Sequence, residues 1–189
     1  MTIHANNQKL ENLTKINMGN YKYVNLQLSG SDLSKLKKIV FPQSFKKMHL
    51  GNTSDNLSEL DFSNTVGEVR IHQHGGMIDG KPQRSYFQVI RNGVVQEVND
   101  DGHKFDNFLM LSDEQLQNIK HIKLGKDTCL LVYQQMPVSP DLTVEFAYDT
   151  PQKLINFMRR ENPQINFMQE QNSKKTKINF DEICGKCRN

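Results

Sequence analysis

The chain has 189 residues, of which 36% are hydrophobic and 24% are charged, and its formal net charge is +3. This length suits one ordinary domain with a sizeable core, and ten Phe, five Tyr and eight Met argue against disorder along the whole chain. The charge surplus of 24 basic over 21 acidic groups is too small to identify a nucleic-acid-binding protein unless the basic residues cluster.

The chain has no apolar run near the roughly 20 residues that a membrane span needs. Residues 1–15 lack the apolar segment of a signal peptide. Three cysteines, Cys129, Cys184 and Cys187, are few and odd in number, which fits a reducing compartment. We therefore predict a cytoplasmic or nuclear protein without a membrane partner.

The N-terminal part of the chain predicts a polar leader followed by a strand. Residues 1–19 are rich in Asn, Lys and Gln without a sustained period, so we expect a flexible leader. In residues 21–28, Val24, Leu26 and Leu28 alternate with polar neighbours, which predicts a half-buried strand.

Two further segments predict strands before the middle of the chain. The apolar residues around Pro42 predict a strand end or a sheet edge, because proline cannot donate to a ladder. Residues 66–74 alternate again, with Val69 and Ile71 on one face. Residues 85–98 contain two β-rich runs joined by Asn92-Gly93, the dipeptide typical of a type I′ hairpin.

Capping signals predict two helices in the second half. Ser112 with Gln115 three residues later forms a capping box. Thr150 is placed as an N-cap before Pro151, and Asn162 followed by proline ends that helix. Two strands lie between the helices, at residues 128–135 and 142–148.

These elements predict an α+β fold with a mainly antiparallel sheet and a few short helices. The predicted organisation is a flexible leader at 1–19, a β-rich domain at 20–150, and a C-terminal helix with a mobile basic tail at 151–189. We find no internal repeat in the sequence.

Four segments, in matching order, resemble the C-terminal half of the ubiquitin-specific protease catalytic domain. They are residues 22–50, VRIHQHGG at 69–76, RSYFQVIRNG at 84–93, and HKFDNFLMLSDEQL at 103–116 with TCLLVYQQ at 128–135. The resemblance covers about residues 20–135 and implies the palm of a papain-like fold. One departure is Ser29-Gly30, which stands where that family has an Arg-Phe pair.

The catalytic groups of that family are mostly missing. The family uses a cysteine nucleophile, a histidine base and an Asp or Asn that orients the base. Asp106 matches the acid, but Ser85 stands at the histidine position, and no cysteine precedes Cys129 in its apolar strand. We therefore predict no catalytic residue, with Ser85 and Asp106 as degenerate positions.

Other pairs of potential metal ligands are incomplete. His72 and His74 share one strand face and form at most half of a metal site, or serve a structural role. Cys184 and Cys187 have the spacing of half a zinc knuckle, without a second pair nearby. We predict neither a metal nor another cofactor.

In the family that the chain resembles, the loops matching residues 30–37 and 75–85 hold the tail of ubiquitin. The resemblance therefore implies a protein-binding surface built from Lys35, Lys37, His74, Gly75, Gly76, Lys81, Arg84, Ser85 and Tyr86. The ubiquitin tail carries two arginines, which the basic residues here would repel. That charge favours an acidic partner or a different protein altogether, although ubiquitin stays an alternative.

The predicted function is a non-catalytic, protease-like protein–protein interaction module of the ubiquitin pathway, acting as a subunit or scaffold of a homo- or hetero-oligomer. A first alternative is a deubiquitinating hydrolase that is split or completed by a partner, or that uses Ser85 as its nucleophile. A second is a nucleic-acid-associated factor using the basic cluster Lys174, Lys175 and Lys177.

Overall fold

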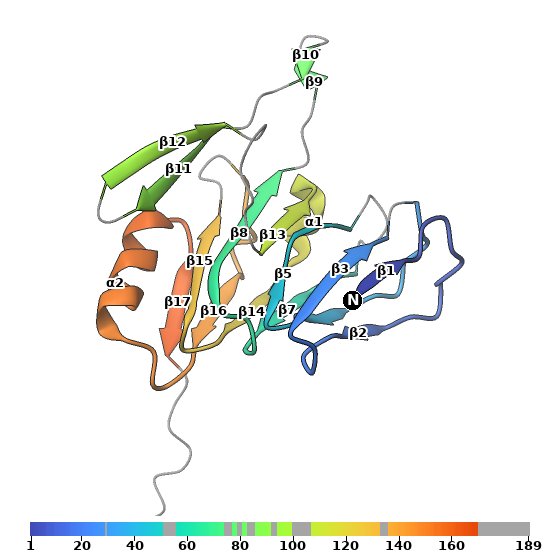
Figure 1. The fold of residues 1–189 in the computed structure, drawn as a ribbon, viewed down its shortest axis with the longest axis horizontal. Coiled ribbons are helices and arrows are strands. Elements are labelled where there is room, and N and C mark those ends of the chain that lie inside the picture. Colours follow the sequence, from blue (N-terminus) through green and yellow to red (C-terminus); the bar gives the residue numbers. More distant parts are fainter. Residues whose placement is uncertain are drawn as a thin grey trace, which may run out of the picture.

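The computed structural model shows two large sheets that share one apolar core (Figure 1). It describes residues 1–28, 30–50, 56–73, 77–78, 81–82, 86–91, 94–99, 107–132 and 136–169. Sheet 1 contains β1 (Thr2–His4), β3 (Tyr23–Gln27), β5 (Ser44–Phe45), β6 (Lys47–His49), β8 (Gly67–Gln73), β13 (Phe108–Leu111) and β15 (Thr128–Val132). Sheet 2 contains β2 (Lys15–Asn17), β4 (Lys38–Val40), β7 (Glu59–Phe62), β14 (His121–Leu124), β16 (Thr143–Phe146) and β17 (Asn166–Gln169).

Every strand pairing within these two sheets is parallel. The α+β class with few helices is confirmed, but the prediction of mainly antiparallel sheets is wrong. The chain crosses from one sheet to the other after most strands instead of turning back beside the strand it has just made. Each passage through both sheets makes one coil, and the stacked coils form a solenoid. In chain order the coils contain β1 and β2, β3 and β4, β6 and β7, β13 and β14, and β15 and β16.

The coils repeat the same pattern of apolar residues. Six positions recur at identical spacing in three coils: Ile3, Ala5, Leu10, Leu13, Ile16 and Met18 in the first, Leu26, Leu28, Leu33, Leu36, Ile39 and Phe41 in the second, and Leu109, Leu111, Leu116, Ile119, Ile122 and Leu124 in the fourth. Equivalent side chains stack between coils, as Phe41 does on Phe62 with ring centroids 4.2 Å apart. Our finding of no internal repeat in the sequence is therefore wrong.

One strand of sheet 1 lies out of chain order. β8 precedes β13 in the sequence, yet β13 lies between β6 and β8. Asn107, the residue before β13, adopts a left-handed conformation with φ 64°, which asparagine tolerates better than most residues. Its side chain accepts from the Phe45 N–H at 2.9 Å and donates to the Val66 carbonyl at 3.0 Å.

The chain between β8 and β13 pairs only with itself in the described residues. β9 (Met77–Ile78) and β10 (Lys81–Pro82) form one two-stranded sheet, and β11 (Tyr86–Arg91) and β12 (Val94–Asn99) form another. The predicted hairpin is confirmed, because Arg91 pairs with Val94 and leaves a two-residue connection. The conformation of Asn92 and Gly93 lies outside the described residues.

Both predicted helices are present, with one correction to their caps. α1 (Asp113–Asn118) has the predicted capping box between Ser112 and Gln115. α2 (Gln152–Glu161) ends at Asn162 as expected, but its N-cap is Pro151 and not Thr150. Thr150 is buried, and its hydroxyl finds no hydrogen-bond partner among the described residues. Neither helix in the described part of the chain has the length and apolar character needed to cross a bilayer.

Helix α2 closes one end of the solenoid (Figure 1). The buried Asn162 side chain accepts from the Val132 N–H at 2.8 Å and donates to the Leu130 carbonyl at 3.1 Å, as the next strand of sheet 1 would do. In addition, the Leu130 N–H lies 3.1 Å from the sulfur of Met158. On sheet 2, the Arg159 guanidinium donates to the Phe167 carbonyl at 3.4 Å.

Residues 1–19 form the first coil, where we expected a flexible leader. β1 pairs with β3, and β2 pairs with β4. The sequence segment is polar overall, but its few apolar residues stand at the positions that the next coil fills with core residues. Strands of three residues are too short to show the alternation of apolar and polar residues that indicates a strand in the sequence.

Candidate functional site

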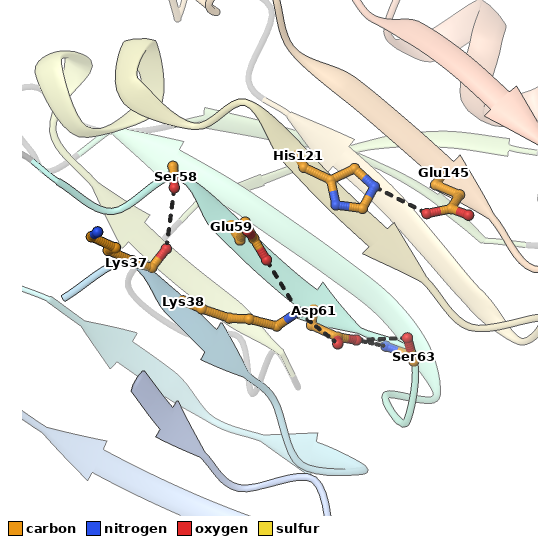
Figure 2. A network of polar contacts seen from close by, with 8 residues as sticks. All are labelled: Lys37, Lys38, Ser58, Glu59, Asp61, Ser63, His121 and Glu145. Carbon is orange, nitrogen blue, oxygen red and sulfur yellow. Dashed lines mark hydrogen bonds and ion pairs between the residues drawn. The ribbon is translucent and has the colours of Figure 1, made fainter. Parts of the chain in front are cut away.

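The outer side of sheet 2 carries polar side chains in rows across neighbouring strands (Figure 2). Leu60, Ile122 and Val144 point into the core, so the residues on either side of each point outward. We call these outward residues the polar face, which consists of Lys38, Glu59, Asp61, His121, Lys123, Thr143 and Glu145. All of them are half-exposed.

Two acidic residues of β7 hold the lysine of β4. The Lys38 ammonium lies 3.1 Å from Glu59 Oε2 and 3.7 Å from Asp61 Oδ2. The hydrogen bond with Glu59 raises the pKa of Lys38 above its ordinary value, although burial opposes this shift. Asp61 also accepts from the Ser63 N–H at 3.1 Å and from the Ser63 hydroxyl at 2.6 Å. The carboxylate of Asp61 is therefore held in place by Lys38 and Ser63.

A second polar contact lies on the next strands of the same face (Figure 2). His121 Nε2 on β14 lies 3.0 Å from Glu145 Oε2 on β16. The strand register places Lys123 between Asp61 and Glu145. Basic and acidic groups thus alternate across the strands, and the face presents both signs of charge at the regular spacing of a parallel sheet.

Two residues of the predicted binding surface lie near this face, in the chain that leads from β3 to β4. The Lys35 ammonium donates to Asn12 Oδ1 at 3.0 Å. The backbone carbonyl of Lys37 accepts from the N–H groups of Ser58 and Glu59, each at 3.0 Å, and its side chain is exposed. Lys37 therefore aligns the start of β7 against β4, while its ammonium faces solvent.

The remaining predicted site residues are not brought together by the described structure. Lys81 lies in β10 and Tyr86 in β11, and neither side chain is described. The others lie outside the described residues: His74, Gly75, Gly76, Arg84, Ser85 and Asp106. The same holds for Cys184, Cys187 and the basic cluster of Lys174, Lys175 and Lys177. The binding surface expected from the resemblance thus stays a prediction.

Cys129 lies in β15, as expected for a residue of an apolar strand. Burial raises the pKa of its thiol to about 12, and the nearby Glu68 adds to the shift. A thiol with this pKa is almost entirely protonated near neutral pH, and the thiolate is the nucleophilic form. In the ranges that the structure describes, no three His, Cys, Asp or Glu residues are grouped so that they could hold a metal ion.

The polar face was not identified from the sequence. The sequence repeat could have indicated this face, because outward residues occupy equivalent positions in successive coils. Lys15 and Lys38 are one such pair, and they lie in register on β2 and β4. Once coils are aligned, outward positions can be separated from inward ones. Without that alignment, the charged residues look like ordinary solvent-exposed residues between core positions.

No family model matches the chain, and no curated protein or solved structure matches it either.

Proposed function

We propose that the chain is a non-catalytic protein–protein interaction module, a subunit or scaffold of a larger assembly, which binds its partner on the polar face. The observation that carries this proposal is the alternation of half-exposed basic and acidic side chains across four adjacent parallel strands. Solenoid proteins commonly bind partners along an extended surface made by successive repeats.

The polar face contributes little to the stability of the fold. Ion pairs between exposed side chains are typically worth about 0.2–1 kcal/mol each. Glu59 is 45% exposed and Lys38 is 34% exposed, so water screens their attraction. Complementary charges on a partner would instead set the orientation and selectivity of binding.

The same charges argue against a nucleic acid as the partner on this face. Glu59, Asp61 and Glu145 would lie against a phosphate backbone and repel it. The non-catalytic part of the proposal is supported by the half-buried thiol of Cys129, whose pKa is raised. Ubiquitin as the partner, and the likeness to a protease palm, depend on the sequence resemblance alone.

The test begins with the partner that co-purifies with the tagged chain from its native cell, whose affinity is then measured with purified components. The variant reverses two charges of the polar face, Glu59→Lys with Glu145→Lys. We expect the dissociation constant to rise by more than about tenfold, because like charges would then face the partner.

The matched control applies the same charge change to two exposed acids that are not part of the polar face, Glu11→Lys with Asp149→Lys. This variant should bind with the affinity of the original chain. Melting temperatures of both variants show whether either has lost its fold. An unchanged dissociation constant for the polar-face variant would refute the proposed site.

A further inference from the structure

Among the described residues no further coil is stacked on the first coil, and its apolar residues are only partly covered. Its six repeat positions match those of the second coil, and the register pairs Ile3 with Leu26 and Ile16 with Ile39. Leu26 is only 3% exposed and Ile39 is 0% exposed. In the first coil, five of the six equivalent side chains are only partly buried: Ile3, Ala5, Leu10, Leu13 and Ile16.

The backbone of the first coil is open on the same side. β1 and β2 are the end strands of sheet 1 and sheet 2 as described. Ala5 donates to Gln27, and Met1 accepts from Asn25, so these odd-numbered residues face β3. The N–H and C=O groups of successive residues point to opposite sides of a strand, so those of Thr2 and His4 point away from β3.

The opposite end of the solenoid differs because α2 closes it. The Asn162 side chain forms hydrogen bonds with the edge of β15, and the Arg159 guanidinium donates to the carbonyl of Phe167. A partner that packs on the first coil must present apolar side chains at the same spacing and two strand edges whose backbone groups can form hydrogen bonds. Among the two ends that the structure describes, only the first coil has both features.

We therefore propose that the first coil is a self-association surface, on which two copies of the chain stack end to end about a two-fold axis. Such an axis pairs the edge strands of the two copies antiparallel and presents the same patch on both sides of the interface. The proposal concerns a different surface from the polar face and does not depend on it.

The size of this end is sufficient for a dimer interface. Two stacked sheets with their side chains are about 20 Å thick, and a strand with its turns spans about 30 Å, which gives roughly 600 Å² for each copy. A symmetric pair would bury on the order of 1,200 Å², at the lower limit of a standard interface. We therefore expect a reversible monomer–dimer equilibrium.

Sedimentation equilibrium of the full chain tests the proposal, with the variant Leu13→Lys. A lysine at this half-buried position keeps its ammonium in water in the monomer, but a dimer would bury it without a partner. We expect the original chain to form dimers as its concentration rises. The variant should raise the dimer dissociation constant by more than about tenfold.

The matched control is Val66→Lys, which places the same side chain at a position that is 48% exposed on a later coil. It should dimerise like the original chain. Hydrogen exchange provides a readout that needs no variant, because the amides of Thr2, His4, Lys15 and Asn17 should become protected as the dimer forms. A chain that stays monomeric, a dimer that leaves these amides unprotected, or a folded Leu13→Lys variant that still dimerises would each overturn the proposal.

Discussion

Replacing Asn162 with alanine should remove the closure of sheet 1 while leaving α2 able to form. The Asn162 side chain is fully buried and makes three hydrogen bonds, with the Val132 N–H at 2.8 Å, the Leu130 carbonyl at 3.1 Å and the Met158 carbonyl at 2.7 Å. The Met158 carbonyl also accepts from the backbone N–H of residue 162, and that bond survives the substitution. Two edge groups of β15 therefore lose their partner.

The expected cost follows from these two groups. A buried donor or acceptor left without a hydrogen bond costs about 1–3 kcal/mol. Two such groups give a range of about 2–6 kcal/mol, and partial access of water at the end of the solenoid favours a value near 3 kcal/mol. For a chain of this size, that loss corresponds to a fall in melting temperature of roughly 6–12 °C.

Urea unfolding measures the change in free energy, and thermal unfolding measures the melting temperature. Asn166→Ala is the matched control, because Asn166 is exposed on β17 and loses the same atoms. Its effect should stay within about 0.5 kcal/mol. If Asn162→Ala costs less than about 1 kcal/mol, the closing role that we assign to its side chain is refuted.

Two further predictions concern the thiol and the packing between coils. Because burial raises the pKa of Cys129 to about 12, iodoacetamide and a cysteine-reactive ubiquitin probe should leave it unmodified near neutral pH. Mass spectrometry should show that alkylation of Cys129 increases with pH. Labelling by iodoacetamide at neutral pH would contradict the raised pKa, and labelling by the ubiquitin probe would contradict the non-catalytic proposal. Gly125→Ala should destabilise the chain by about 1–3 kcal/mol, since the new Cβ would lie 2.5 Å from the Ser63 carbonyl oxygen of the preceding coil. Gly19→Ala is its control and should cost less, because its closest contact is the movable Asn64 side chain; equal effects in urea unfolding would count against close packing at Gly125.

Elements that depend on local signals could be predicted from the sequence. The strand with Val24 and Leu26 was identified by alternation alone, and both side chains are buried. The capping box of Ser112 and Gln115 was identified by the spacing of two residue types. These features are encoded within a few neighbouring residues, so no knowledge of distant partners is needed.

The direction of strand pairing could not be predicted in the same way. Alternation shows that one face of a strand is buried, but it is equally compatible with a parallel or an antiparallel neighbour. The repeat would have indicated parallel coils, yet it is interrupted where residues 74–107 separate the third coil from the fourth. Aligning Leu33, Leu36 and Ile39 with Leu116, Ile119 and Ile122 would have revealed it.

The polar face could not be predicted from the sequence, although the setting of Cys129 could. The placement of Cys129 in an apolar strand was predicted correctly, because a continuous apolar run is a local feature. The polar face depends on pairings between residues that are far apart, such as Lys123 with Asp61, and these follow from the order of the coils. Charged residues in strands of three or four residues carry no such information by themselves.

The unusual position of β13 between β6 and β8 has a consequence for the way the chain reaches its native state. During synthesis β8 is made before either of its neighbours, β13 and β15, so Val69 and Ile71 have no strand on either side at that time. The N-terminal coils are able to stack as they leave the ribosome, but sheet 1 stays divided until residues 108–111 enter the space beside β6. Long-range pairings of this kind slow folding. The second half of the chain therefore completes the first, and a nascent chain that stops before β13 would expose the edges of β6 and β8 to other unfinished chains.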